Sequence, residues 1–263
     1  WPADVHLVGK DILRFHAVIW PAMLMAAGLP LPKKVFAHGW LMVGGEKMSK
    51  SKANKIAPSE ITDHFGVDAF RYYFLRAIPF GSDGSFSWED MSARYTSELA
   101  NDFGNLASRL AAMIEKYCGG KVPAVAKDPE LSAALAATVE KADAAMVALD
   151  FQGGINAVME FCKQVNGFVT VKEPWILAKD PANQAILEDV LYNTAESLRA
   201  LAVLLHPVMP ATTEILWESL GAKAALGEIG SQDISKVASW GQLPQGATVT
   251  KTPVLFPRLE VKE

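Results

Sequence analysis

Length, composition and charge exclude several classes of protein. The chain has 263 residues, of which 50% are hydrophobic and 21% charged, so it is neither disordered nor fibrous and is long enough for one large or two modest domains. Its two cysteines, Cys118 and Cys162, cannot form a disulfide framework or a four-cysteine zinc site, so we expect a reducing, cytoplasmic environment. The net charge of -4 excludes a chain that is basic throughout, but it leaves a local nucleic-acid footprint open.

No segment of the sequence has the pattern of a membrane span or a secretory signal. The most apolar early run, residues 17–31, is interrupted by two prolines and a glycine, so it is too short and too broken to cross a bilayer. The chain starts at Trp1 with a pattern typical of the middle of a domain, which predicts a fragment of a longer protein.

Residues 1–57 have the pattern of an α/β fold. A short apolar run at 5–8 that ends in a glycine predicts a buried parallel strand, and residues 12–23 repeat apolar side chains at helical spacing. Residues 34–39 predict a second strand, and residues 40–43 lead into a Gly-Gly turn. Strand, helix and strand in this order predict one right-handed crossover of a parallel sheet.

Residues 58–92 have the pattern of a connector. They contain two short predicted helices, at 59–65 and 68–77, and then a segment at 81–88 that is rich in Gly, Ser and Asp and is predicted to be a loop. The connector separates the α/β pattern from a region that is helical throughout.

From residue 93 onward apolar residues recur at steps of three and four. We predict helices at 93–117, 131–149, 154–171 and 182–206, with a further short helix to Leu220. Several antiparallel helices with short connections predict a helix bundle over 93–225. The tail, 226–263, has few helix signals and is expected to run back over another surface.

Positive charge is concentrated in residues 33–55, which carry a net +5, whereas residues 1–32 are balanced and the rest of the chain carries -9. Within this segment a Gly-Gly turn is followed by the pentapeptide KMSKS at residues 47–51. Two ammonium groups three residues apart on a glycine-hinged loop can bind a polyphosphate, because lysine acts as a compact point charge. The alternative interpretation is a solvated basic turn.

KMSKS resembles the second signature of class I aminoacyl-tRNA synthetases, and the surrounding chain resembles the methionyl-tRNA synthetase family almost from end to end. The matching stretches are 9–12, 15–23, 36–40, 68–73, 105–109 and 172–175. The resemblance implies a partial Rossmann-like nucleotide fold of parallel α/β class over 1–57, followed by an all-α anticodon-binding helix bundle. It also implies a stem-contact connector at 58–92 and a tail that packs back on the catalytic side.

The activity implied by the resemblance is methionine–tRNA ligation. Methionine is activated with ATP to methionyl-adenylate and is then transferred to the 3′ end of tRNA(Met), including the initiator. The implied partners are therefore tRNA(Met), L-methionine and ATP with Mg²⁺ as substrate. We expect a cytoplasmic monomer that binds no membrane. The resemblance also implies that these residues bind no metal, since zinc, where the family has it, belongs to an insertion upstream of Trp1.

The resemblance also implies roles for individual residues around the nucleotide. Lys50 is the principal pyrophosphate-binding lysine and Lys47 assists it, so both are candidate catalytic residues that stabilise charge in the transition state. The implied ATP-binding residues are Gly9, Asp11, His38, Gly39, Leu41, Met48, Ser49 and Lys50. Several of these residues follow predicted parallel strands, where α/β folds bind their ligands.

For methionine, the resemblance implies a pocket lined by Phe15, His16 and Trp20. His16 and Trp20 are one helical turn apart and share a face. Aromatic walls suit a thioether, since each sulfur–aromatic contact contributes roughly 0.3–1.5 kcal/mol, and the histidine offers the sulfur one weak donor. Without the resemblance, a His and a Trp on an apolar helix face are more often core residues.

A polar stripe in the predicted helix 93–117 is the candidate anticodon reader. Asn101, Asn105 and Arg109 recur every four residues, and amide and guanidinium groups can pair with base edges or hold phosphate. The resemblance adds Pro174 and Trp175, with Trp175 as the stacking plane and Pro174 fixing its presentation; such stacking contributes roughly 1–3 kcal/mol per base. The alternative is three polar residues on a wet helix face and a tryptophan that plugs the bundle.

The remaining features are assigned supporting roles. Residues 83–90 resemble the family's stem-contact region, to which we assign positioning only. His6, His64 and His206 are interpreted as structural.

The first class I signature, HIGH, does not occur in these residues, so we expect little or no methionine activation by this chain alone. Two other hypotheses remain open. The chain is a tRNA-binding module without chemistry, or it belongs to another class I synthetase, for leucine, isoleucine, valine or cysteine.

Overall fold

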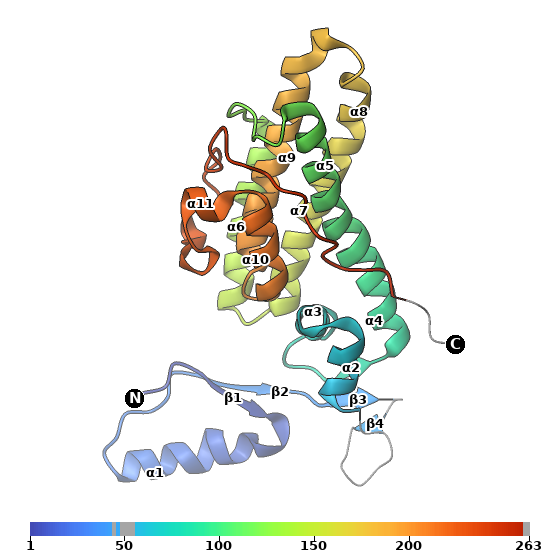
Figure 1. Cartoon of the computed structure of the whole chain (residues 1–263). Coiled ribbons are helices and arrows are strands. Elements are labelled where there is room, and N and C mark those ends of the chain that lie inside the picture. Colours follow the sequence, from blue (N-terminus) through green and yellow to red (C-terminus); the bar gives the residue numbers. More distant parts are fainter. Residues whose placement is uncertain (44–45, 48–55, 260–263) are drawn as a thin grey trace.

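A computed structural model describes residues 1–43, 46–47 and 56–259 of the chain. A small α/β unit and a much larger helical unit lie one above the other, and a short connector joins them (Figure 1). The expected order of an α/β part followed by a helix bundle is confirmed. Among the described residues, no helix combines the length and apolarity that crossing a membrane would require.

The α/β unit is one crossover of a parallel sheet. Strand β1 (His6–Gly9) pairs in parallel with β2 (Val35–His38), and Gly9 lies opposite His38 in the register. The chain between the strands forms a helix in three successive pieces, which together cover the predicted helix at 12–23. They are the 3-10 helix η1 (Lys10–Ile12), the π-helix η2 (Phe15–Ile19) and the α-helix α1 (Trp20–Ala26).

A second small sheet lies beside the connector. Strand β3 (Leu41–Val43) pairs in parallel with β5 (Gly84–Phe86) and antiparallel with β4 (Glu46–Lys47). The prediction of a loop over 81–88 was therefore wrong at its centre. Gly84 fits β5 because a Cβ there would lie 2.2 Å from the Ile78 side chain. Three residues of strand within a Gly, Ser and Asp context are too short to give a period-2 signal.

The connector fastens the two units together. Helices α2 (Pro58–Phe65) and α3 (Val67–Ala77) are those expected from the sequence. The buried Asp68 carboxylate accepts a 2.6 Å hydrogen bond from the backbone amide of Thr212. Arg71 donates to the carbonyls of Pro207 and Val208, at 2.8 and 2.9 Å. These bonds tie α3 to the turn between two bundle helices.

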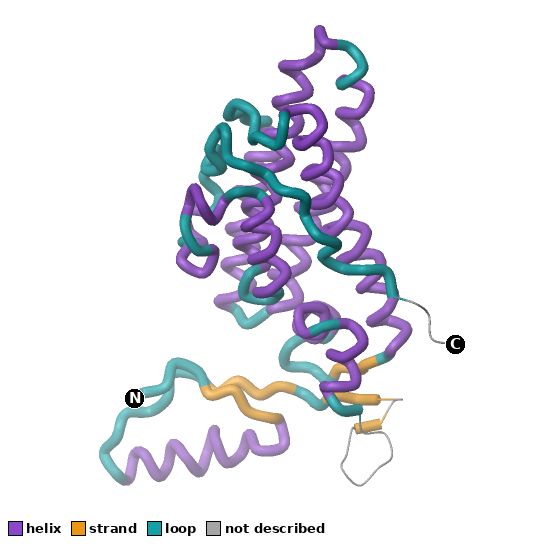
Figure 2. The backbone as a smooth tube through the Cα atoms, in the orientation of Figure 1, coloured by secondary structure: helices purple, strands orange, loops and turns teal. Residues whose placement is uncertain are grey.

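The helical unit contains every helix that the periodicity predicts, with shifts of a few residues at the ends. Its elements are α4 (Trp88–Arg94), the π-helix η3 (Tyr95–Gly104), α5 (Asn105–Cys118), α6 (Pro129–Val147), α7 (Phe151–Lys172), α8 (Pro174–Leu177), η4 (Pro181–Asn183), α9 (Gln184–Leu205), α10 (Pro210–Ser219), α11 (Ala222–Leu226), η5 (Ile229–Ser231) and η6 (Ile234–Lys236). Figure 2 shows α4, η3 and α5 as one continuous rod. Helix α9 is the centre of the unit, since every residue from Val190 to Leu205 is buried.

The rod differs from prediction at its centre. Residues 95–104 form a π-helix with i→i+5 hydrogen bonds, where the sequence predicts an α-helix over 93–117. Tyr95, Leu99 and Phe103 are all buried and follow one another at strict steps of four, which suits a turn wider than about 3.6 residues. Mixed steps of three and four resume in α5, where α-helical bonding also resumes.

The C-terminal tail lies against the rod. Val122 exchanges backbone hydrogen bonds with Gly246 and Ala247, at 2.9 Å each. Further along, the Tyr95 hydroxyl donates to the carbonyl of Pro257, and the Phe256 ring lies 3.7 Å from a Cβ placed on Gly104. The tail therefore runs back along α5 and η3 towards the connector, as the thin red segment in Figure 1 shows. The boundaries at 57, 92 and 225 stay predictions.

A buried ion pair anchors the start of this tail. The carboxylate of Glu196 accepts a bond from Arg199 at 2.9 Å and three more from the backbone amides of 241–243, at 2.9–3.1 Å. Arg199 also donates to the Val237 carbonyl at 2.9 Å. Both side chains are at most 1% exposed, so their charges are neutralised by each other and by backbone groups rather than by water.

Candidate functional site

The nucleotide side of the site begins at the carboxyl ends of β1 and β2. Gly9 and His38 face each other there, and the Asp11 carboxylate folds back so closely that a Cβ on Gly9 would lie 2.7 Å from it. Glycine at position 9 therefore leaves space for Asp11 and for close approach of a ligand to the backbone. The structure brings these three predicted residues together on one sheet edge, as parallel strands require.

Gly39 packs against the loop that precedes β5. A Cβ on Gly39 would lie 2.2 Å from the Ser82 carbonyl oxygen, so only glycine fits without moving the backbone. The adjacent Asp83 accepts a 2.8 Å bond from the Trp40 amide and pairs with Lys10 at 2.6 Å. Asp83 lies in the segment 83–90, to which only a positioning role was assigned. Its two bonds hold the sheet edge from the connector side. Within that segment Ser87 caps α4 by accepting from the Asp90 amide.

Leu41 lies at the start of β3, where its side chain is half-buried. It lines a small apolar hollow of about 160 Å³ together with Ile61, Phe70 and Phe86. Lys47 is described only as a backbone position in β4, opposite Met42. Met48, Ser49 and Lys50 lie outside the described residues, so their predicted roles stay predictions.

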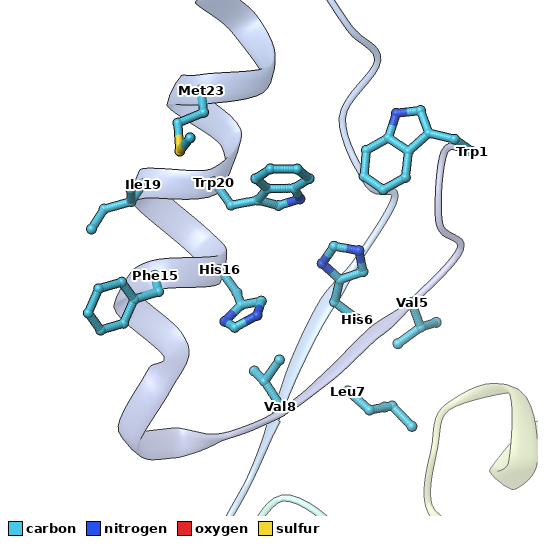
Figure 3. Close-up of a pocket in the computed structure, with 10 residues that line it drawn as sticks. All are labelled: Trp1, Val5, His6, Leu7, Val8, Phe15, His16, Ile19, Trp20 and Met23. Carbon is cyan, nitrogen blue, oxygen red and sulfur yellow. The ribbon is translucent and has the colours of Figure 1, made fainter.

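A large hollow lies between β1 and the helix that follows it (Figure 3). Its volume is about 600 Å³, and it is lined by Trp1, Val5, His6, Leu7, Val8, Phe15, His16, Ile19, Trp20 and Met23. All three predicted methionine-binding residues therefore border one space. Figure 3 shows His16 and Trp20 pointing towards His6 and Trp1, while Phe15 lies with Ile19 and Met23 on the adjoining side of the helix.

The hydrogen bonding of His16 changes the expected chemistry of this hollow. Its Nδ1 lies 3.0 Å from the Ile12 carbonyl oxygen, which can only accept, so Nδ1 carries the hydrogen. In the neutral ring Nε2 is then an acceptor and has no hydrogen to offer a thioether sulfur. The hollow therefore suits a thioether through aromatic and apolar contact, and the donor expected from the histidine requires the protonated ring.

His6 is a residue that the sequence analysis assigned to structure and that the fold places in the hollow. Its ring lies 6.2 Å from that of His16 and 6.0 Å from that of Trp1. Its Nδ1 is buried, and no hydrogen bond to it exists within the described residues. The sequence did contain a signal for this placement. Side chains alternate along β1, so His6 lies on the same strand face as Val8. His64 packs against the rings of Phe65 and Trp88. His206 shares a hydrogen bond with Thr213.

The predicted anticodon residues lie on the rod and on α8. The Arg109 guanidinium lies 5.3 Å from the centre of the Trp175 ring, although the two residues come from different helices. Glu173 has a left-handed backbone, φ 45° and ψ 57°, that ends α7, and the buried Pro174 then starts α8. This sharp turn presents the half-buried Trp175 ring beside α5. Arg109 and Trp175 therefore form a half-buried cation–aromatic pair.

Asn101 and Asn105 are exposed on the same rod, and the tail forms a wall beside them. A hollow of about 230 Å³ is lined by both asparagines and by residues of the tail, among them Phe256 and Arg258. Sequence reasoning missed this contribution of the tail, because nothing in residues 254–258 marks them as neighbours of Asn101. The apolar stripe of the rod faces the core, which leaves the two asparagines facing solvent.

Burial controls the ionisation of the groups behind this face. Desolvation raises the pKa of the Asp102 carboxyl, and it raises the pKa of the Cys162 thiol to about 12.

Within residues 1–43, 46–47 and 56–259, no group of three His, Cys, Asp or Glu side chains is placed to hold a metal ion.

Comparison with known families gives two matches along the chain. Residues 2–111 match the family described as "tRNA synthetases class I (M)", and residues 128–250 match the "Anticodon-binding domain of tRNA ligase". The first match contains the sheet edge, the connector and the polar stripe Asn101, Asn105 and Arg109, and the second contains Trp175.

Individual relatives agree with these matches. The chain is 63% identical to the methionine–tRNA ligase of Streptomyces coelicolor; the match covers the whole chain and 50% of that relative. It is 44% identical to the methionine–tRNA ligase of Bacillus subtilis, of which it covers 40%. A solved Mycobacterium tuberculosis methionyl-tRNA synthetase in complex with methionyl-adenylate superposes with a TM-score of 0.86 at 39% identity, over 98% of this chain and 50% of that one. The chain thus spans about half the length of these relatives or less. It belongs to the methionyl-tRNA synthetase family of class I tRNA synthetases.

Proposed function

We propose that this chain supplies the KMSKS half-site and the anticodon-reading bundle of a methionine–tRNA ligase. The complete reaction activates methionine with ATP to methionyl-adenylate, releases pyrophosphate and transfers the methionyl group to the 3′ end of tRNA(Met), including the initiator. The observation that carries the proposal is the Arg109–Trp175 pair, one helical turn from the exposed Asn105, because an aromatic ring, a guanidinium and an amide can stack on bases and pair with their edges.

In the proposed activation step, the chain contributes shape and charge rather than a proton acceptor. His16 and Trp20 hold the methionine side chain in the large hollow, and Gly9 with Asp11 holds the ribose at the sheet edge. The methionine carboxylate attacks the α-phosphate, and Lys50, assisted by Lys47, stabilises the negative charge on the leaving pyrophosphate.

Two further roles belong to the same proposal. His38, Gly39 and Leu41 contact the nucleotide, with Met48 and Ser49 completing the phosphate loop. Mg²⁺ enters as the partner of ATP and neutralises phosphate charge. We place the reaction in the cytoplasm and expect a monomer, which light scattering on the purified protein would check.

The anticodon role is tested by RNA binding. The substitution Trp175→Ala removes the stacking plane, so binding of an RNA hairpin with a CAU loop is expected to weaken by about 1–3 kcal/mol, roughly 5- to 150-fold. Ile176→Ala, one residue further along α8 and 44% exposed, is the matched control and should bind as the unaltered chain does. Equal CAU affinity of the Trp175→Ala variant and the control would refute the proposed reader.

The catalytic role is tested by methionine-dependent ATP–pyrophosphate exchange. Because these residues lack HIGH, the proposal expects exchange only when a polypeptide that carries this signature is supplied. Restored exchange with methionine separates the enzyme from a tRNA-binding module without chemistry. Parallel reactions with leucine, isoleucine, valine and cysteine distinguish the other class I specificities, and exchange with any of them in preference to methionine would refute the assignment.

A further inference from the structure

The rod changes its hydrogen-bonding pattern where the candidate anticodon residues lie. The π-helix η3 ends at Gly104 and α5 begins at Asn105, whose backbone amide still donates to the carbonyl of Ala100, five residues back. Beyond this point, in α5, each backbone amide donates to the carbonyl four residues back, as in an ordinary α-helix. π-Helical stretches are rare in proteins and often occur at functional sites.

Contacts from a neighbouring helix hold the backbone at this junction. At this junction the carbonyl of Asp102 accepts a 2.9 Å hydrogen bond from the side-chain amide of Asn166 on α7, and the Cys162 thiol lies 3.6 Å from the same oxygen. A second bond, 3.1 Å from the Asn166 amide to the Cys162 carbonyl, fixes the orientation of that amide.

This contact lies directly behind the candidate reading face. Asp102 is the residue between Asn101 and Asn105 whose carbonyl turns inward to α7, while both asparagines are exposed and line the hollow beside the tail. The register of the junction sets the angle between Asn101 and Asn105, because a turn of the π-helix holds more residues than a turn of the α-helix.

We propose that Asn166 is a positioning residue for anticodon recognition, which acts through the Asp102 carbonyl to hold the π-to-α junction and so the relative placement of Asn101 and Asn105. The inference rests on the proposed anticodon role. Asn166 itself is half-buried on the side of α7 that faces the rod, so in this proposal it acts on RNA through the backbone of the rod.

The test compares RNA hairpins with a CAU loop and with one altered anticodon base, bound to the full chain. Asn166→Asp keeps the shape of the side chain but replaces its donor by an acceptor that repels the Asp102 carbonyl. We expect its CAU affinity to fall about three- to tenfold, the effect of one lost hydrogen bond, while the already weak binding of the altered hairpin stays unchanged.

Two further variants separate positioning from folding. Asn166→Gln retains the donor and should recover most of the discrimination. Asn156→Asp makes the same chemical change on an exposed residue of α7 and should behave as the unaltered chain. Where the Asn166→Asp variant does not fold, Asn166→Leu, which lacks the donor and is close in volume, carries the same comparison.

The outcomes distinguish the two proposals. An unaltered ratio of CAU to altered-hairpin affinity in the Asn166→Asp variant would overturn the positioning role while leaving the proposed function in place. Equal loss of affinity for both hairpins would also overturn it, since that is what general damage to the bundle produces. If the unaltered chain itself fails to discriminate the hairpins, the proposed anticodon role fails, and the inference fails with it.

Discussion

The first 43 residues and the helical unit differ most in how far their apolar side chains are buried. In residues 1–43 only Val8 and Leu24 are buried, and large apolar side chains such as Val18 and Met25 are 62% and 69% exposed. In α9, by contrast, sixteen consecutive positions from 190 to 205 are buried, including the charged Glu196 and Arg199. One region presents an open apolar surface, and the other encloses a complete core.

The difference fits the kinds of site that the two regions carry. In residues 1–43, aromatic rings border the large hollow, which a small ligand can enter, whereas Val18 and Met25 are not among the residues that line it. The closed region supports the candidate anticodon residues Asn101, Asn105, Arg109 and Trp175 from behind, so their side chains extend from rigid helices. Stability should therefore depend on the helical unit, and the following variants test this.

The largest effect is expected from Glu196→Ala. It leaves the Arg199 charge buried without its partner and removes the acceptor of three backbone amides, so the free energy of unfolding should fall by about 3–5 kcal/mol. Chemical denaturation followed by helical circular dichroism measures this change. The control Glu218→Ala removes an exposed partner of Lys223 and should cost at most about 1 kcal/mol. Equal losses in the two variants would show that burial of the pair does not matter.

Core truncation should separate the two regions directly. Leu201→Ala deletes a side chain that is 0% exposed and should lower the free energy of unfolding by about 2–5 kcal/mol. Met25→Ala, on the open region, should change it by less than about 0.5 kcal/mol. The same denaturation assay applies to both variants. A loss above 2 kcal/mol for Met25→Ala would break the comparison.

Alkaline pH should destabilise the helical unit through Cys162. Burial raises the pKa of this thiol from about 9 to about 12, so the stabilisation is complete below pH 9 and is lost as the pH rises towards 12, because only the unfolded chain releases the proton there. One such proton gives a slope of about 1.4 kcal/mol per pH unit. Unfolding measured at several values between pH 9 and 10 should show a shallower decline for Cys162→Val. Burial also raises the pKa of the half-buried Cys118, to about 11, so Cys118→Val should make the decline shallower by nearly the same amount in this range. An unchanged slope in Cys162→Val would exclude this thiol as the cause.

A small effect is also expected at the sheet edge. Lys10 pairs with Asp83 at 2.6 Å and lies over the Trp40 ring, but the two charged side chains are 38% and 42% exposed. Solvent screens such a pair, so Lys10→Met should lower the free energy of unfolding by at most about 1 kcal/mol, as thermal melts can measure. A loss as large as that of Glu196→Ala would show that the sheet edge stabilises the fold as strongly as the core does.

Much of the organisation could be predicted from local patterns. Helical periodicity located the bundle helices, and a strand, helix and strand in sequence indicated the parallel pair that brings Gly9 to His38. The i, i+4 spacing placed His16 and Trp20 on one face, and the fold confirms that they border the same hollow. These inferences succeed because each depends on residues within about one turn of helix or one strand.

Other features were decided by contacts between distant segments. The sequence determined the family resemblance, the order of the two units and most helices, because these follow from short-range periodicity and motifs. Only the tertiary structure places His6 in the large hollow, lays the tail beside Asn101 and connects Asn166 to the Asp102 carbonyl. In the last case the partners are 64 residues apart and belong to different helices. A backbone carbonyl that accepts a bond from another helix leaves no trace in the pattern of side chains, so packing alone determines which residue donates to it.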